Sequence, residues 1–296
     1  MKKLCYICEA TQGGVRKHLR DLLRAFLKPA EGFAVSAILA DRGEPGLRRE
    51  LEQMQGLEFH FVPDLQRAIR PFKDAAAYMQ IKELLRRIRP DIVHTQSSKA
   101  GILGRQAAHQ LGITNVIHTA HVFPFQWASG AAGRVYLGLE RHAARYTRRL
   151  VCVGESQRAD VLARRLAPAE KLVVIRNGIE LPPVSGDERD AVRFTLDLPP
   201  DACAIGMVAR LAPQKGVSAF VDAAALVIRK RPDVIFLIVG GGPLEDEVRS
   251  RMRQLGLPNE QFRLLGHRED AELLYPAFDV VVLSSLYEGL PYVLLE

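Results

Sequence analysis

The chain has 296 residues, of which 48% are hydrophobic and 25% are charged, with 23 Gly, 17 Pro and 4 Cys. Such a composition belongs to a globular protein and excludes a disordered chain, a collagen-like chain and a small disulfide scaffold. No apolar run reaches the ~20 residues that span a bilayer, and no signal peptide develops after Met1. We therefore expect a protein of the cytoplasm, with two domains at this length.

Positive charge is concentrated in the first part of the chain. The formal net charge is +7, and residues 1–180 carry 29 Lys and Arg against 17 Asp and Glu, whereas residues 181–296 carry 12 against 17. This asymmetry indicates an anionic partner such as the inner face of the plasma membrane, and a well-solvated arginine-rich surface is an equally good explanation. We expect no nucleic-acid partner. Two basic groups are candidates for a membrane contact: Arg16, Arg20, Arg24 and Lys28, and Arg141, Arg145, Arg148 and Arg149.

Short β-branched runs alternate with helical patterns along the first part. A helix is expected over 15–27, because its leucines recur at helical spacing. Strand-helix alternation of this kind is typical of parallel sheets with right-handed crossovers. The expected strands are 4–8, 33–39, 58–62, 91–95, 115–118, 150–153 and 172–175.

The alternation lapses over 181–202, a proline-rich stretch that is typical of an interdomain connection. It then restarts, which predicts a second α/β domain over 203–296 beside a first over 1–180. The chain stops at Glu296, in what we expect to be a helix opened by Pro291, so this second domain is predicted to be incomplete. Two doubly wound domains would face a shared cleft that binds a nucleotide. The expected strands are 204–208, 234–239, 262–265 and 280–283, and the expected helices 217–228, 244–255 and 270–274.

Glycines and cations follow the ends of several expected strands. Gly13 and Gly14 lie between a strand and a helix, where backbone N–H groups approach an anion, although a plain tight turn is an equally good interpretation. Arg210 and Lys215 follow the first strand of the second domain, and two cations there suit a diphosphate. Gly241 and Arg268, which follow the next two strands, are expected at the same edge of the sheet.

Two acidic residues stand eight apart near the end of the chain. Glu288 is followed by Gly289, Leu290 and Pro291, and Glu296 closes the stretch. Carboxylates so placed can accept hydrogen bonds from the vicinal hydroxyls of two sugars, such as a donor hexose and a ribose. A glycosidase-like pair is the alternative, and it would need both carboxyls beside one glycosidic bond.

The spacing Glu288-x7-Glu296 is that of retaining GT-B glycosyltransferases, and the chain resembles glycosyltransferase family 4. The resemblance covers nearly the whole chain. It also rests on 13–18, 94–105, 118–123, 177–179, 210–216 and 240–243.

The resemblance implies a role for each matching residue. Arg210 and Lys215 would hold the donor diphosphate, Glu288 the donor sugar, and Glu296 the ribose. His121 would lie beside the transferred sugar. The remaining donor contacts would come from Gly13, Gly14, Gly241, Arg268, Gly289 and Leu290.

The expected function is therefore that of a retaining hexosyltransferase that uses a nucleotide-diphosphate sugar, most simply a UDP-sugar. The resemblance implies an acceptor glycan, in bacterial relatives often lipid-linked, in surface polysaccharide synthesis. No metal or other cofactor is expected, since fixed cations would do a metal's electrostatic work. Two alternatives stay open at this point: a GT-B epimerase or phosphorylase, and a non-catalytic nucleotide-sugar-binding protein.

Overall fold

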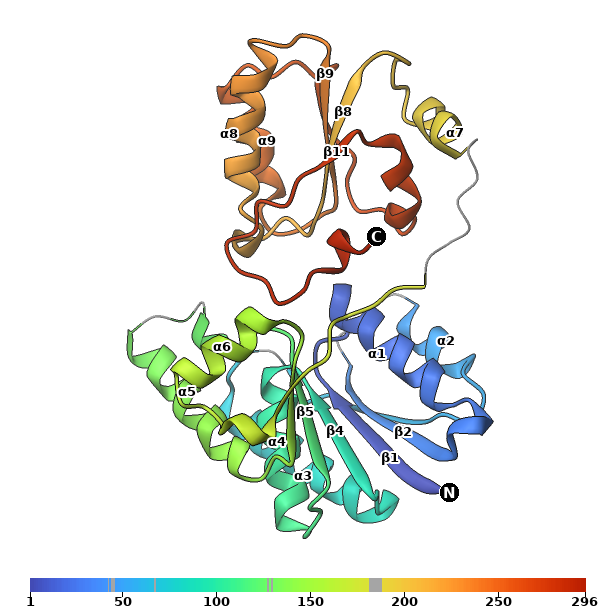
Figure 1. Ribbon diagram of the computed structural model, residues 1–296, viewed down its shortest axis with the longest axis vertical. Helices are drawn as coiled ribbons and strands as arrows, with labels where there is room; N and C mark the ends of the chain where they lie inside the picture. The colour runs from blue at the N-terminus through green and yellow to red at the C-terminus, as the bar shows by residue number, and fades with distance from the viewer. Residues whose placement is uncertain (42, 44–45, 67, 127, 129, 181–187) are drawn as a thin grey trace. The chain divides into compact units, whose positions relative to one another are not determined.

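The computed structural model describes residues 1–41, 43, 46–66, 68–126, 128, 130–180 and 188–296 (Figure 1). The chain divides into two compact units, Met1–Asn177 and Gly178–Glu296. Of the predicted connection over 181–202, residues 181–187 lie outside the described residues. The rest begins with a helix, α7 (Glu188–Thr195), which packs within the second unit.

The first unit is built on a parallel sheet of seven strands in the order β3-β2-β1-β4-β5-β6-β7. Each strand lies within two residues of its predicted position, because β-branched runs ended by polar residues define a buried parallel strand well. The strands are β1 (Lys2–Cys8), β2 (Phe33–Ala40), β3 (Glu58–Val62), β4 (Ile92–Gln96), β5 (Val116–Ala120), β6 (Arg149–Cys152) and β7 (Leu172–Val174).

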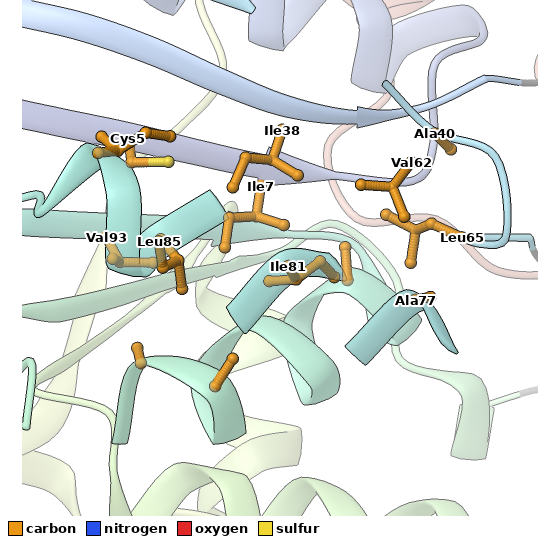
Figure 2. Close-up of a cluster of buried hydrophobic side chains, with 14 of the residues drawn as sticks. Cys5, Ile7, Ile38, Ala40, Val62, Leu65, Ala77, Ile81, Leu85 and Val93 are labelled. Atoms are coloured by element: carbon orange, nitrogen blue, oxygen red, sulfur yellow. The ribbon is translucent and has the colours of Figure 1, made fainter. Parts of the chain in front are cut away.

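Helices cover both faces of this sheet (Figure 1). Helices α1 and α2 pack with one core cluster of β1 and β2, and α3 and α4 pack with another on the opposite face. Figure 2 shows this second cluster, in which Ile7 and Ile38 of the sheet point toward Ile81 and Leu85 of α3. The helices are α1 (Gly13–Phe26), α2 (Leu47–Glu52), α3 (Pro71–Ile88), α4 (Ser98–Gln110), α5 (Gly130–Arg145) and α6 (Glu155–Ala163).

The second unit has a parallel sheet of four strands in the order β10-β9-β8-β11. Helices α8 and α9 cover one face, and α7 and a 3-10 helix, Ala271–Ala277, pack with the core cluster on the other. The elements are β8 (Cys203–Val208), α8 (Val217–Ile228), β9 (Val234–Val239), α9 (Glu245–Gln254), β10 (Phe262–Leu264) and β11 (Val280–Val281).

Three predictions for the second unit are wrong in detail. The helix expected over 270–274 is the 3-10 helix Ala271–Ala277, which contains Pro276, a residue without the N–H that an α-helix needs. The strand expected over 280–283 forms ladder pairs only at Val280–Val281. The helix expected after Pro291 is a single 3-10 turn, Tyr292–Leu294.

Strand order reverses once in each sheet, between β1 and β4 in the first unit and between β8 and β11 in the second. Helices that follow the strands on either side of such a point leave in opposite directions, which opens a crevice outside the carboxyl ends of the strands. The fold therefore places ligand sites after β1 and β4 and after β8 and β11.

Candidate functional site

Arg210 lies in the loop that follows β8, at the reversal point of the second sheet. Its side chain is exposed, and within the described part of the chain it forms no ion pair or side-chain hydrogen bond. The loop itself is held by its backbone: Ala209 N–H donates to the carbonyl of Val239 (2.9 Å), and Leu211 N–H donates to that of Gly241 (3.0 Å). The guanidinium is thus a free cation on a fixed loop.

The glycines that follow β9 let the Arg210 loop lie close to the edge of the sheet. Gly240 has φ 141°, and a Cβ there would lie 1.9 Å from the carbonyl oxygen of Ala209. Any side chain would push the Arg210 loop away from the sheet edge. Gly241 supplies the carbonyl that Leu211 N–H uses, so the run positions the cation by backbone contact.

Lys215 and Glu288 form an ion pair on neighbouring loops, with side chains 21% and 17% exposed. The two loops are also joined by backbone: Leu286 N–H donates to the carbonyl of Gln214 (2.8 Å), and the Gln214 amide donates to that of Tyr287 (3.0 Å). A diphosphate entering this loop pair would compete with Glu288 for Lys215, because both are anions that the ammonium can bind.

Gly216 makes the contact between these loops possible. Its φ is 60°, and a Cβ would lie 2.1 Å from the carbonyl oxygen of Ser284. The Ser284 hydroxyl donates to the carbonyl of Lys215 (2.9 Å). Position 216 therefore needs glycine for both its conformation and its space.

Two predicted donor contacts have partners elsewhere in the second unit. Arg268 is held by Asp270 in a two-bond ion pair of 2.8 and 2.6 Å within its own loop. Glu296 accepts a hydrogen bond from the Tyr275 hydroxyl (3.0 Å), and burial together with this carboxylate raises the pKa of Tyr275. Gly289 and Leu290 lie in the loop between Glu288 and the last 3-10 turn. The structure thus groups Arg210, Lys215, Gly241 and Glu288 on interlocked loops.

In the first unit, Gly13 and Gly14 are the first residues of α1, whereas the sequence placed them in a turn before the helix. The opening N–H groups of an α-helix have no intrahelical acceptor and form its positive end. This helix start follows β1 at the reversal point of the sheet. An anion-binding role for both glycines stays a prediction.

Glu9, which the sequence analysis missed, occupies the neighbouring helix start. Its carboxylate accepts the backbone N–H groups of Lys99 (2.9 Å) and Ala100 (2.8 Å) at the start of α4, and the residue is 6% exposed. The Ser97 hydroxyl also donates to it, with Ser97 at φ 62°. The N-terminus of α4 is therefore already neutralised by a carboxylate of the chain.

His121 lies after β5 among buried polar groups. Its Nε2–H donates to the Gln96 side-chain oxygen (3.3 Å), and its ring meets that of His18 edge to face, with centroids 4.7 Å apart. Burial, with the charges of His18 and His94, holds the pKa of His121 well below its usual range. Burial also lowers the pKa of His18 to about 4 and of His94 to about 3. His121 is consequently a neutral hydrogen-bond donor at pH 7 and a poor general base.

Two buried polar groups of the first unit have no hydrogen-bond partner within the described residues: the amide nitrogen of Gln96, whose side-chain oxygen contacts His121, and the Thr11 hydroxyl. A buried polar atom left unpaired costs about 1–3 kcal/mol. Across the described ranges, no three His, Cys, Asp or Glu side chains are placed to hold a metal ion.

Doubly wound parallel sheets, with two cations and a carboxylate at a reversal point, define a class of proteins that bind sugar nucleotides or similar diphosphates. Residues 13–178 match the family described as "Glycosyl transferase 4-like domain", and residues 188–296 match "Glycosyl transferases group 1". The chain belongs to this family of glycosyltransferases, and its fold is the GT-B fold, as the sequence predicted.

Known relatives agree with this assignment. The chain is 35% identical over 278 residues to the Escherichia coli UDP-Gal:alpha-D-GlcNAc-diphosphoundecaprenol alpha-1,3-galactosyltransferase, covering 91% of this chain and 70% of that one. It is 23% identical to the Staphylococcus aureus capsular polysaccharide biosynthesis glycosyltransferase CapM, covering 84% of this chain and 66% of that one. Among solved structures, Anabaena Alr3699/HepE in complex with UDP and glucose has the same fold, with a TM-score of 0.78, 21% identity, and coverage of 96% and 74%.

Proposed function

We propose that this protein is a retaining, metal-independent glycosyltransferase that moves a sugar from a UDP-sugar to a lipid-linked glycan acceptor during surface polysaccharide synthesis. The observation that carries the proposal is the loop group after β8 and β11, where Arg210 lies exposed and Lys215 pairs with Glu288. A diphosphate bound there would contact the two cations Arg210 and Lys215. A sugar hydroxyl would donate a hydrogen bond to the Glu288 carboxylate.

The loop group suits the chemistry of transfer. As the bond between the sugar's anomeric carbon and the β-phosphate oxygen breaks, the leaving diphosphate gathers negative charge. Arg210 and Lys215 bind that charge most strongly when it is greatest, which lowers the barrier. The acceptor hydroxyl oxygen attacks the anomeric carbon from the face that the diphosphate leaves. Its proton passes to the departing phosphate oxygen. Glu288 accepts hydrogen bonds from the sugar hydroxyls and holds the ring in place.

The name of the Escherichia coli relative supports the proposed substrates, since it specifies UDP-Gal and a diphosphoundecaprenol-linked acceptor. An acceptor of that kind lies in a membrane, whereas no helix within the described residues is both long and apolar enough to cross one. We infer that the protein works in the cytoplasm as a peripheral protein at the inner face of the plasma membrane.

A transfer assay tests this proposal. The protein is incubated with UDP-galactose, UDP-glucose or UDP-N-acetylglucosamine and a polyprenyl-diphosphate-linked N-acetylglucosamine, and the glycolipid product is measured. One donor should yield an extended glycolipid and free UDP. Lys230→Ala, at an exposed position just after the C-terminal end of α8, is the matched control for Lys215→Ala. A new sugar nucleotide formed from donor alone would indicate an epimerase, and donor binding without turnover a binding protein. Either result contradicts the proposal.

A further inference from the structure

Helix α5 (Gly130–Arg145) turns apolar side chains outward. Val135 is 59% exposed and Leu139 is 42% exposed, and the two are one helical turn apart. The helix contains a single acidic residue, Glu140, and that residue is fully buried. A surface helix ordinarily buries its apolar side chains and exposes its charged ones, and Val135, Leu139 and Glu140 depart from this pattern.

A buried ion pair fixes the orientation of α5 about its own axis. The Arg105 guanidinium of α4 donates to the Glu140 carboxylate (2.6 Å) and to the carbonyl of Gly101 (2.8 Å), and both charged side chains are fully buried. Separating such a pair leaves an uncompensated buried charge, which costs about 3–5 kcal/mol. Val135 and Leu139 are thereby held at the surface.

The exposed side of α5 is also basic. Arg134, Arg141 and Arg145 lie at positions i, i+7 and i+11, along one flank of the apolar residues, and all three are exposed. Within the described residues, none of them pairs with a carboxylate. Because Glu140 is turned inward, the helix offers no acidic side chain of its own to neutralise them.

Of the two basic groups in the sequence analysis, the second shares Arg141 and Arg145 with α5, whereas its Arg148 and Arg149 lie beyond the helix. The first group, on and just after α1, differs from the α5 arginines. Arg16 is paired with Glu50 at 2.8 Å, and Arg20 lies 3.2 Å from Asp21. Half of that group is therefore neutralised by the protein itself. The exposed arginines of α5 have no such carboxylate partner within the described residues.

We propose that the α5 face, made of Arg134, Val135, Leu139, Arg141 and Arg145, docks the protein on an anionic lipid bilayer. The guanidinium groups bind lipid phosphates, and the two apolar side chains enter the boundary between headgroups and acyl chains. A bilayer satisfies both chemistries at once, which neither solvent nor a purely acidic surface does. The inference rests on the proposed function, because an enzyme that acts on a lipid-linked acceptor must reach that acceptor at a membrane.

Vesicle co-sedimentation tests the inference. The protein is mixed at low salt with vesicles of phosphatidylcholine, with or without phosphatidylglycerol as about one third of the lipid. Wild type should bind only the anionic vesicles and dissociate as salt is raised. Arg141→Glu with Arg145→Glu should lower the partition coefficient by at least fivefold per residue. Val135→Ser with Leu139→Ser should lower it about tenfold while keeping every charge.

Two controls keep the result specific. Arg24→Glu with Lys28→Glu reverses two exposed cations, one in α1 and one just after it, and Phe72→Ser removes a 93% exposed ring of α3. Neither should change binding by more than twofold. The inference is overturned if wild type does not bind anionic vesicles, if the controls lose binding while the α5 variants keep it, or if light scattering shows that the α5 face joins two copies of the chain. Turnover with a water-soluble acceptor, measured without vesicles, reports separately on the proposed function.

Discussion

At the scale of single residues, the Lys215–Glu288 pair separates binding of the nucleotide from transfer of the sugar. Glu288 competes with a diphosphate for Lys215, so Glu288→Gln should keep or raise the affinity for UDP. The same change weakens the hold on the sugar hydroxyls, so kcat should fall on the order of 100-fold. Calorimetry with UDP beside a turnover assay checks both parts. A loss of UDP affinity in this variant would show that Glu288 does not oppose the diphosphate.

Arg210 should matter mainly in the transition state. Arg210→Ala is expected to lower kcat on the order of 100- to 1000-fold, the scale for losing one fixed charge partner of the leaving group. Its exposed side chain forms no ion pair or side-chain hydrogen bond within the described residues, so the thermal midpoint should stay near that of wild type. An unchanged kcat in the folded variant would remove Arg210 from the site.

The buried histidines predict a pH-dependent stability. The pKa of His18 is lowered to about 4 and that of His94 to about 3 by burial, against about 6.5 in the unfolded chain. Below pH 6.5 the unfolded state binds protons that the folded state does not, so the free energy of unfolding falls as pH falls from 6.5 toward 4. The loss for His18 alone is on the order of 3 kcal/mol at pH 4.

Thermal unfolding over that pH range tests this account. His18→Gln should reduce the slope of the profile between pH 4 and 6.5, because the replacement does not titrate, while His94 and His121 keep their own contribution. His109→Gln, at an exposed position of α4, is the control for the substitution itself. Equal slopes in wild type and His18→Gln would mean that His18 titrates normally in the folded protein.

At the scale of elements, the loop pair of the second unit depends on Gly216. Gly216→Ala places a methyl group against the Ser284 carbonyl and strains a φ of 60°, so the Lys215 loop must move. UDP affinity should fall at least tenfold and stability by about 1–3 kcal/mol. Gly256→Ala is a matched control: its φ is 64°, but nothing lies within 4 Å of the added Cβ. If both variants bind UDP with equal affinity, the close contact between Gly216 and the Ser284 carbonyl is not needed for UDP binding.

The sequence predicted the regular elements well and the irregular ones poorly. The strands of the first unit lie within two residues of their predicted positions, because buried parallel strands have a strong apolar signal. The 3-10 helix Ala271–Ala277 was predicted as a shorter ordinary helix and β11 as a longer strand, since the type and length of such short elements depend on tertiary packing. The contacts of Glu9 with Lys99 and Ala100 cross about 90 positions in sequence and arise from the pairing of β1 with β4, which no local pattern reveals.

The candidate site was predicted unevenly for the same reason. Arg210, Lys215, Gly241 and Glu288 follow strand ends, and the topology brings strand ends together. The Arg268–Asp270 pair and the Glu296–Tyr275 hydrogen bond depend on side-chain choices within the folded unit. The functional roles of all these residues stay predictions.

At the scale of the whole molecule, fixed cations should make a metal unnecessary. Arg210 and Lys215 already supply positive charge where the diphosphate would lie. Turnover in EDTA should stay within about twofold of turnover in Mg²⁺, since no metal would carry the leaving-group charge. Loss of activity in EDTA that Mg²⁺ restores would contradict this prediction.

The central claim is that the loops after β8 and β11 hold the diphosphate of a UDP-sugar. Isothermal titration calorimetry with UDP is its most direct test, on wild type, Lys215→Ala and the control Lys230→Ala. Wild type and Lys230→Ala should bind UDP with equal affinity, and Lys215→Ala should bind it on the order of 10- to 100-fold more weakly, as expected for losing a charge-assisted contact. Equal affinity in all three proteins, or no binding by wild type, would contradict the account.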